Sequence, residues 1–186
     1  MKRAWLPILA LAFAVGCQNG GSGSGPRPDS VVPRPMVIPD GGGERRLMRG
    51  GTAPLLIKVD PTNTGSLHMV LGSSDLPPGD AIGVHRHLQE DEIIVITRGT
   101  ARVQLGRQFM TASAGATVFI PQGTCIGVTN VGSDTLSNFF VFSAPGFERA
   151  LRAVSSAPGE PPKPLTPQLR QTAFHDAHAV ADPADC

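Results

Sequence analysis

Short apolar runs, most of them five to eight residues long and rich in β-branched or aromatic side chains, recur through the middle of the chain. Turn-forming pairs such as Asp-Pro, Arg-Gly and Ala-Gly separate them. Regular spacing of this kind is typical of a β-sandwich or a β-barrel. The unbroken apolar sequence 93–96 predicts a strand that is covered on both faces. The runs are 54–59, 66–71, 80–87, 91–97, 100–105, 107–111, 116–120, 124–130 and 135–143.

Two short helices are expected after the last run. Four apolar residues recur at helical spacing and predict one apolar stripe on a helix within 145–154. They are Phe147, Ala150, Leu151 and Val154. A second helix is expected to begin with Thr166 as its N-cap and Pro167 in its first turn, and to fray after Phe174.

The composition divides the chain into a folded centre and open flanks. The 22 Gly and 18 Pro residues are dense in 17–53 and in 157–167, and are spread singly between these stretches. We therefore expect a linker over 17–53, one β-domain over 54–154, and a Pro-rich segment with a helical tail over 155–186.

The formal net charge of +1 argues against nucleic acid as a partner. Three arginines are interpreted as a solvated patch: Arg45, Arg46 and Arg49.

The first residues, 1–16, have the pattern of an export signal. Lys2 and Arg3 precede an apolar run over 4–15, which is too short to span a bilayer. The run ends in Ala-Val-Gly-Cys at 14–17, which resembles the bacterial lipobox. That resemblance implies a lipid on Cys17, and it predicts an exported protein anchored to a membrane of the bacterial cell envelope.

Two other cysteines remain if Cys17 carries lipid. An exported protein could join Cys125 to Cys186 by a disulfide. Because Cys186 is the last residue, a bridge to a mobile end would constrain little. We expect both to be free thiols.

Candidate chemistry lies between Gly79 and Gly99. His85 and His87 are two residues apart on an expected strand, so both side chains face the same side. Glu92 begins the next run, close enough to turn back beside them. Two imidazoles and one carboxylate suit Fe(II), with Mn, Ni, Zn or Cu as alternatives. His68 is interpreted as a surface histidine or a core histidine with a local hydrogen bond, and His175 and His178 as solvated.

The spacing of these residues resembles the two conserved motifs of the cupin superfamily. Gly79, His85, His87, Glu92 and Gly99 stand at the fixed positions of the first motif, and Gly115, Pro121, Gly123 and Asn130 at those of the second. The resemblance covers about 66–143 and implies a small antiparallel, jelly-roll-like β-barrel. The sequence at 142–148 and the later Leu-Thr-Pro-Gln resemble the tail of single-domain, quercetin-dioxygenase-like cupins.

One position departs from the cupin pattern. The resemblance implies a fourth metal ligand, a histidine, where this chain has Ile126. Cys125 faces the other way on a regular strand and is a poor substitute. His85, His87 and Glu92 could still hold a metal with open positions. Without metal, the barrel would be an apolar ligand site with Ile126 in its wall.

Two functions therefore stay open. One is a metal-dependent enzyme of the dioxygenase type acting on a small organic substrate, with isomerase or lyase chemistry as variants. The other is a non-catalytic module that binds a small molecule at the cell envelope. No catalytic residue is assigned, and a homodimer is also left open.

Overall fold

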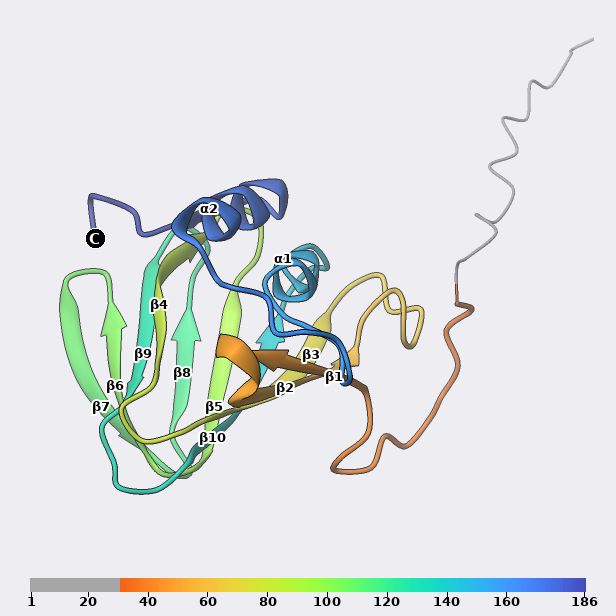
Figure 1. Ribbon diagram of the computed structural model, residues 1–186, viewed down its shortest axis with the longest axis horizontal. Helices are drawn as coiled ribbons and strands as arrows, with labels where there is room; N and C mark the ends of the chain where they lie inside the picture. Colours follow the sequence, from red (N-terminus) through yellow and green to blue (C-terminus); the bar gives the residue numbers. More distant parts are fainter. Residues whose placement is uncertain (1–30) are drawn as a thin grey trace, which may run out of the picture.

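Two antiparallel sheets face each other in the computed structural model, which describes residues 31–186 (Figure 1). The predicted signal sequence and Cys17 lie outside the described residues. The first sheet has the order β1 (Glu44–Met48), β2 (Ala53–Val59), β3 (Val70–Leu76), β10 (Leu136–Phe142), β5 (Glu92–Arg98), β8 (Thr117–Ile120). The second has the order β11 (Ala179–Ala181), β4 (Ala81–His87), β9 (Cys125–Asn130), β6 (Thr100–Leu105), β7 (Gln108–Ser113). The all-β, jelly-roll-like fold predicted from the sequence is confirmed.

Alternating side chains of the two sheets fill the core between them. On β9, Ile126 and Val128 are buried, and on β10 the same holds for Leu136, Phe140 and Phe142. The expectation that 93–96 is covered on both faces is wrong. Ile94 and Ile96 are 3% and 0% exposed, whereas Ile93 is 37% exposed. The reason is that one face of this antiparallel sheet packs on the core while the other meets solvent.

Most of the predicted apolar runs coincide with strands, but one strand begins later than predicted and another lies in the predicted linker. The run expected at 66–71 becomes a strand only from Val70, because Ser66 closes a turn first: its hydroxyl donates to the carbonyl of Met69 at 2.7 Å. Residues 44–48, predicted as linker, form β1 and pair with β2. The five-residue sequence of β1 is largely charged and contains no apolar run that would predict a strand.

The fold extends N-terminal of β1 as well. Lys58 is 5% exposed, and its ammonium donates to the carbonyl oxygens of Pro39, Asp40 and Gly42. These three acceptors satisfy the buried charge. The interpretation of Arg45, Arg46 and Arg49 as a solvated patch is wrong for two of them. Only Arg45 is exposed, whereas Arg46 and Arg49 are half-buried.

Two helices and a 3-10 turn, η1 (Arg49–Gly51), complete the domain. α1 (Glu148–Ala153) presents the predicted apolar stripe to the core. α2 (Pro167–Asp176) begins as predicted, with Thr166 Oγ1 accepting from the amide of Leu169 at 3.1 Å. Within residues 31–186, no helix is long and apolar enough to cross a membrane.

The C-terminus does not fray, and the expectation of free thiols is wrong. After α2 the chain forms β11, which pairs with β4. This pairing carries the last residue to the start of β9, where Cys186 forms a disulfide with Cys125 across a Cα–Cα distance of 6.0 Å. An ordered terminus removes the reason for which the bridge was discounted.

Candidate metal centre

The three predicted ligands meet between the two sheets. His85 and His87 lie on β4, and Glu92 is the first residue of β5 on the opposite sheet. One ligand atom from each lies within 4.8 Å of the others. The three residues are 4%, 2% and 5% exposed, so the cluster is shielded from bulk water.

His85 is held as a neutral ring. Its Nδ1 lies 2.9 Å from the carbonyl oxygen of Gly83, so Nδ1 carries the proton and Nε2 keeps its lone pair. Burial and the neighbouring His87 lower the pKa of His85 from 6.5 to about 3. The ring stacks on Phe147 with 5.5 Å between centroids. A neutral imidazole with a free Nε2 is the form that binds metals.

His87 lies between two carboxylates. Its Nδ1 lies 3.0 Å from Oε1 of Glu90, and its Nε2 lies 3.3 Å from Oε2 of Glu92. Burial alone would lower the pKa of His87, but the hydrogen bond with Glu90 and the adjacent carboxylate of Glu92 raise it to about 9. Glu90 is 2% exposed and was missed in the sequence. The sequence offers one sign of its role: Glu90 is an acidic residue in the tight turn between the predicted ligands His87 and Glu92.

The donor set fits a divalent cation. His87 Nε2 and Glu92 Oε2 are buried and, among the described residues, neither has a partner with hydrogen-bond geometry. Buried polar atoms without partners are costly, and a cation bound to both would satisfy them. Glu90 and the Gly83 carbonyl hold the two rings through Nδ1, the usual support behind metal-binding histidines. Imidazole and carboxylate donors suit Fe, Mn, Ni, Zn or Cu.

An apolar cavity of about 100 Å³ adjoins two of the three candidate ligands, His85 and Glu92. Ile126 is 0% exposed and lines it, directly opposite His85 in the pairing of β4 with β9. Cys125 faces away from the cavity, as the alternation along the strand predicts. Phe147 and Phe174, from the two helical segments, close the cavity near His85.

A few polar side chains also line the cavity. They are Arg49, Ser74, Asp75, Asn138 and Arg170. Neither these nor Phe147 and Phe174 were singled out as site residues in the sequence, because they come from segments far apart along the chain. His68, interpreted as a surface or core histidine, is exposed, and so are His175 and His178, which were interpreted as solvated.

Comparison with known proteins finds the same family, the cupins, that the motif spacing resembles. The Cupin domain family matches residues 72–142. Among solved structures, a predicted oxalate decarboxylase from Thermotoga maritima is similar at 23% identity and a TM-score of 0.53, covering 59% of this chain and 100% of its own. KdgF from Halomonas sp. is similar at 15% identity and a TM-score of 0.52, covering 60% and 96%.

A RmlC-like cupin from Shewanella frigidimarina is similar at 14% identity and a TM-score of 0.50, covering 63% of this chain and 95% of its own. At these identities the structures are evidence for the fold alone. No curated protein matches the chain. The motif spacing and the two-sheet fold agree with the match of residues 72–142 to the Cupin domain family.

Proposed function

We propose that this protein is a metal-dependent cupin enzyme of the dioxygenase type, which holds a divalent metal on His85, His87 and Glu92. The observation that carries the proposal is the support of both rings through Nδ1, by Gly83 and by Glu90. That support leaves each Nε2 for the cation, beside a carboxylate oxygen that has no hydrogen-bond partner among the described residues.

The chain's own residues prepare a dry site for a small organic molecule. A metal held by three protein ligands keeps open positions and supplies Lewis-acid or redox chemistry. Ile126 and Phe147 exclude water beside His85, and Glu90 holds the ring of His87 in place. The largely apolar wall favours a substrate with an apolar body, bound in the cavity beside the ligands.

Metal content of the full-length chain, purified without a His tag, tests the proposal. We expect one equivalent of iron, nickel or manganese by elemental analysis. His87→Ala should remove that metal, whereas His68→Ala, a matched change at an exposed histidine, should keep it. Folded protein that contains no metal, and takes up none when it is offered, would overturn the proposal.

A second function is favoured by one specific observation. Ile126 fills the position of the fourth cupin ligand and is completely buried against the cavity. A barrel with a degraded metal site and an apolar wall would serve as a non-catalytic module that binds a small molecule at the cell envelope. The metal-content experiment separates this function from the first, because the module folds and binds without metal.

Membrane anchoring is proposed from the sequence. The lipobox-like ending at Cys17 and the Gly/Ser-rich sequence after it support a lipid anchor with a flexible tether. Cys17→Ser should then release the protein from membranes, as measured by fractionation and immunoblotting. Retention of Cys17→Ser on membranes after a high-salt wash would overturn the anchor.

A further inference from the structure

The last twenty residues, Pro167–Cys186, form a cover over the strand that carries both candidate histidine ligands. Within this C-terminal cover, β11 pairs with β4 so that Ala179 lies opposite His87 and Ala181 opposite His85. Two further backbone hydrogen bonds extend the pairing: Leu88 donates to His178 at 2.9 Å, and Asp182 donates to Val84 at 3.0 Å. The cover is therefore joined directly to the backbone of the candidate site.

Phe174 is the side chain of the cover that seals the site. It is 7% exposed, lines the cavity, and lies edge-on to His85 with 5.5 Å between ring centroids. The guanidinium of Arg170 lies over this ring at 4.9 Å from its centroid and donates to the carbonyl of Val84 at 2.9 Å. His85 is only 4% exposed because Phe174 and Phe147 pack against it.

Two attachments of the cover to the barrel are weak, the segment that leads into it and the pairing of β11. Residues 158–168, which lead into it, are exposed throughout. β11 has three residues and is an edge strand, and short edge pairings open at low free-energy cost. Neither the exposed segment that leads into the cover nor the short edge pairing of β11 therefore holds the cover firmly to the barrel.

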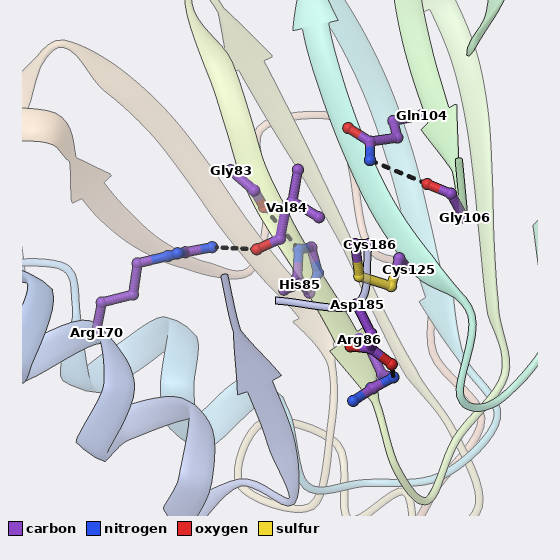
Figure 2. Close-up of a disulfide and its surroundings, with 10 residues drawn as sticks. All are labelled: Gly83, Val84, His85, Arg86, Gln104, Gly106, Cys125, Arg170, Asp185 and Cys186. Atoms are coloured by element: carbon purple, nitrogen blue, oxygen red, sulfur yellow. Dashed lines mark hydrogen bonds and ion pairs between the residues drawn. A yellow bond between two sulfur atoms is a disulfide. The ribbon is translucent and has the colours of Figure 1, made fainter. Parts of the chain in front are cut away.

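The C-terminal end is attached covalently. Cys186 is bound to Cys125, the first residue of β9 and the neighbour of the cavity residue Ile126. Beside the disulfide, Arg86 of β4 pairs with Asp185 at 2.8 Å (Figure 2). The disulfide thus closes a loop of the chain that contains α1, α2 and β11, and it fixes the free end of the cover to the barrel.

We propose that the Cys125–Cys186 disulfide is a clasp that positions the cover over His85 and sets how readily the candidate metal centre opens to solvent. Cys186 is then a positioning residue that acts through β11 and Phe174. A loop closed by a covalent bond samples fewer open conformations than the same loop with a free end. The statement about metal rests on the proposed function, whereas the statement about opening concerns the barrel alone.

Carbethoxylation of histidines in the metal-free, full-length chain tests the opening. Diethyl pyrocarbonate modifies accessible imidazoles, and peptide mass spectrometry reads each histidine separately. The exposed His68 is an internal reference outside the cover. In Cys186→Ser we expect modification of His85, relative to His68, to rise roughly tenfold. Asp185→Asn, which removes the neighbouring ion pair but keeps the disulfide, should behave as wild type because an exposed ion pair contributes little.

Hydrogen exchange of the same proteins separates a local clasp from general stabilisation. We expect faster exchange over 167–186 in Cys186→Ser, and in wild type reduced with dithiothreitol, with β5 and β10 protected as before. Unchanged modification of His85 after loss of the disulfide would overturn the proposal. Loss of protection throughout the barrel would overturn it too, because the disulfide would then stabilise the whole fold.

Release of Ni(II) to excess EDTA tests the consequence for the metal. We expect release from Cys186→Ser to be roughly tenfold faster than from wild type, and release from Asp185→Asn to match wild type. Equal release rates in the presence and absence of the disulfide would refute control of the metal centre by the clasp. A chain that binds no Ni(II) would instead count against the proposed function, and the carbethoxylation result would still decide the clasp.

Discussion

Ile126 lies directly opposite His85 in the antiparallel pair formed by β4 and β9. Both side chains line the same cavity, and neither is more than 4% exposed. The cupin pattern has a histidine ligand at this position. The departure of this chain from that pattern is therefore in the side chain at position 126, while the backbone pairing places the residue beside His85.

Ile126→His should create a fourth ligand. We expect Ni(II) affinity to rise, because the three other ligand atoms already lie within 4.8 Å of one another. Without metal the variant should be less stable by roughly 1.5–3 kcal/mol, the transfer free energy of a buried isoleucine, since the new imidazole finds no ready partner. With metal the stability should recover, because ligand binds the folded state preferentially. Thermal unfolding with EDTA and with Ni(II) measures both effects.

Thr129→His is the matched control, since Thr129 lies on the same strand and its side chain points to the opposite face. It should gain no metal-dependent stability. If Ile126→His gains no more than Thr129→His, the account of a missing fourth ligand fails.

The sequence predicted most of the barrel because its signals are local. Apolar runs bounded by turn residues locate β2 and β4–β10, and the N-cap pattern at Thr166 locates α2. The candidate ligands follow from residue spacing, which a regular strand and one tight turn translate directly into proximity.

What was missed depends on contacts between distant segments. β1 is held in the first sheet by its pairing with β2 and by the contacts of Arg46 with Ser155, which lies 109 residues away. The disulfide joins cysteines 61 residues apart and requires the pairing of β11 with β4. Neither relationship has a local sequence signal. Glu90 differs, because it lies in the motif, but its role appears only once the turn has folded toward His87.

Glu90→Gln should weaken metal binding without removing a ligand. The glutamine keeps the shape of the side chain but loses the charge that orients His87 and makes its ring more basic. Loss of such a supporting carboxylate typically costs about 10–100-fold in metal affinity. Competition with a chromophoric chelator measures the affinity for Ni(II). Glu160→Gln, at an exposed residue between the helices, is the control and should match wild type. Equal affinity in the two variants would show that Glu90 does not support the site.

Metal affinity should increase with pH up to about 9. In the metal-free protein burial lowers the pKa of His87, but the hydrogen bond with Glu90 and the adjacent carboxylate of Glu92 outweigh burial and raise it to about 9. A proton therefore occupies the ring at neutral pH, and the metal must displace it. The pKa of His85 is about 3, so this ring releases no proton above pH 5. Affinity then rises by about tenfold per pH unit below 9.

Calorimetry in two buffers of different ionisation enthalpy measures the protons that are released. We expect about one per metal at pH 7 and none well above pH 9. Binding at pH 7 with no proton release would contradict the protonated state of His87.

Arg46→Met tests whether β1 belongs to the folded domain. Arg46 donates to the carbonyl of Ser155 at 2.8 Å, to its hydroxyl at 3.0 Å and to the carbonyl of Arg152 at 3.0 Å. These bonds fasten β1 to the end of α1, and hydrogen bonds to a charged group contribute about 1.5–3 kcal/mol. We expect the free energy of unfolding to fall by roughly that amount, as measured by urea denaturation. Arg45→Met, a change at the neighbouring exposed arginine, should stay within about 0.5 kcal/mol of wild type. If the two variants unfold at the same urea concentration, the bonds of Arg46 contribute nothing to the stability of the barrel, and β1 is held by its pairing with β2 alone.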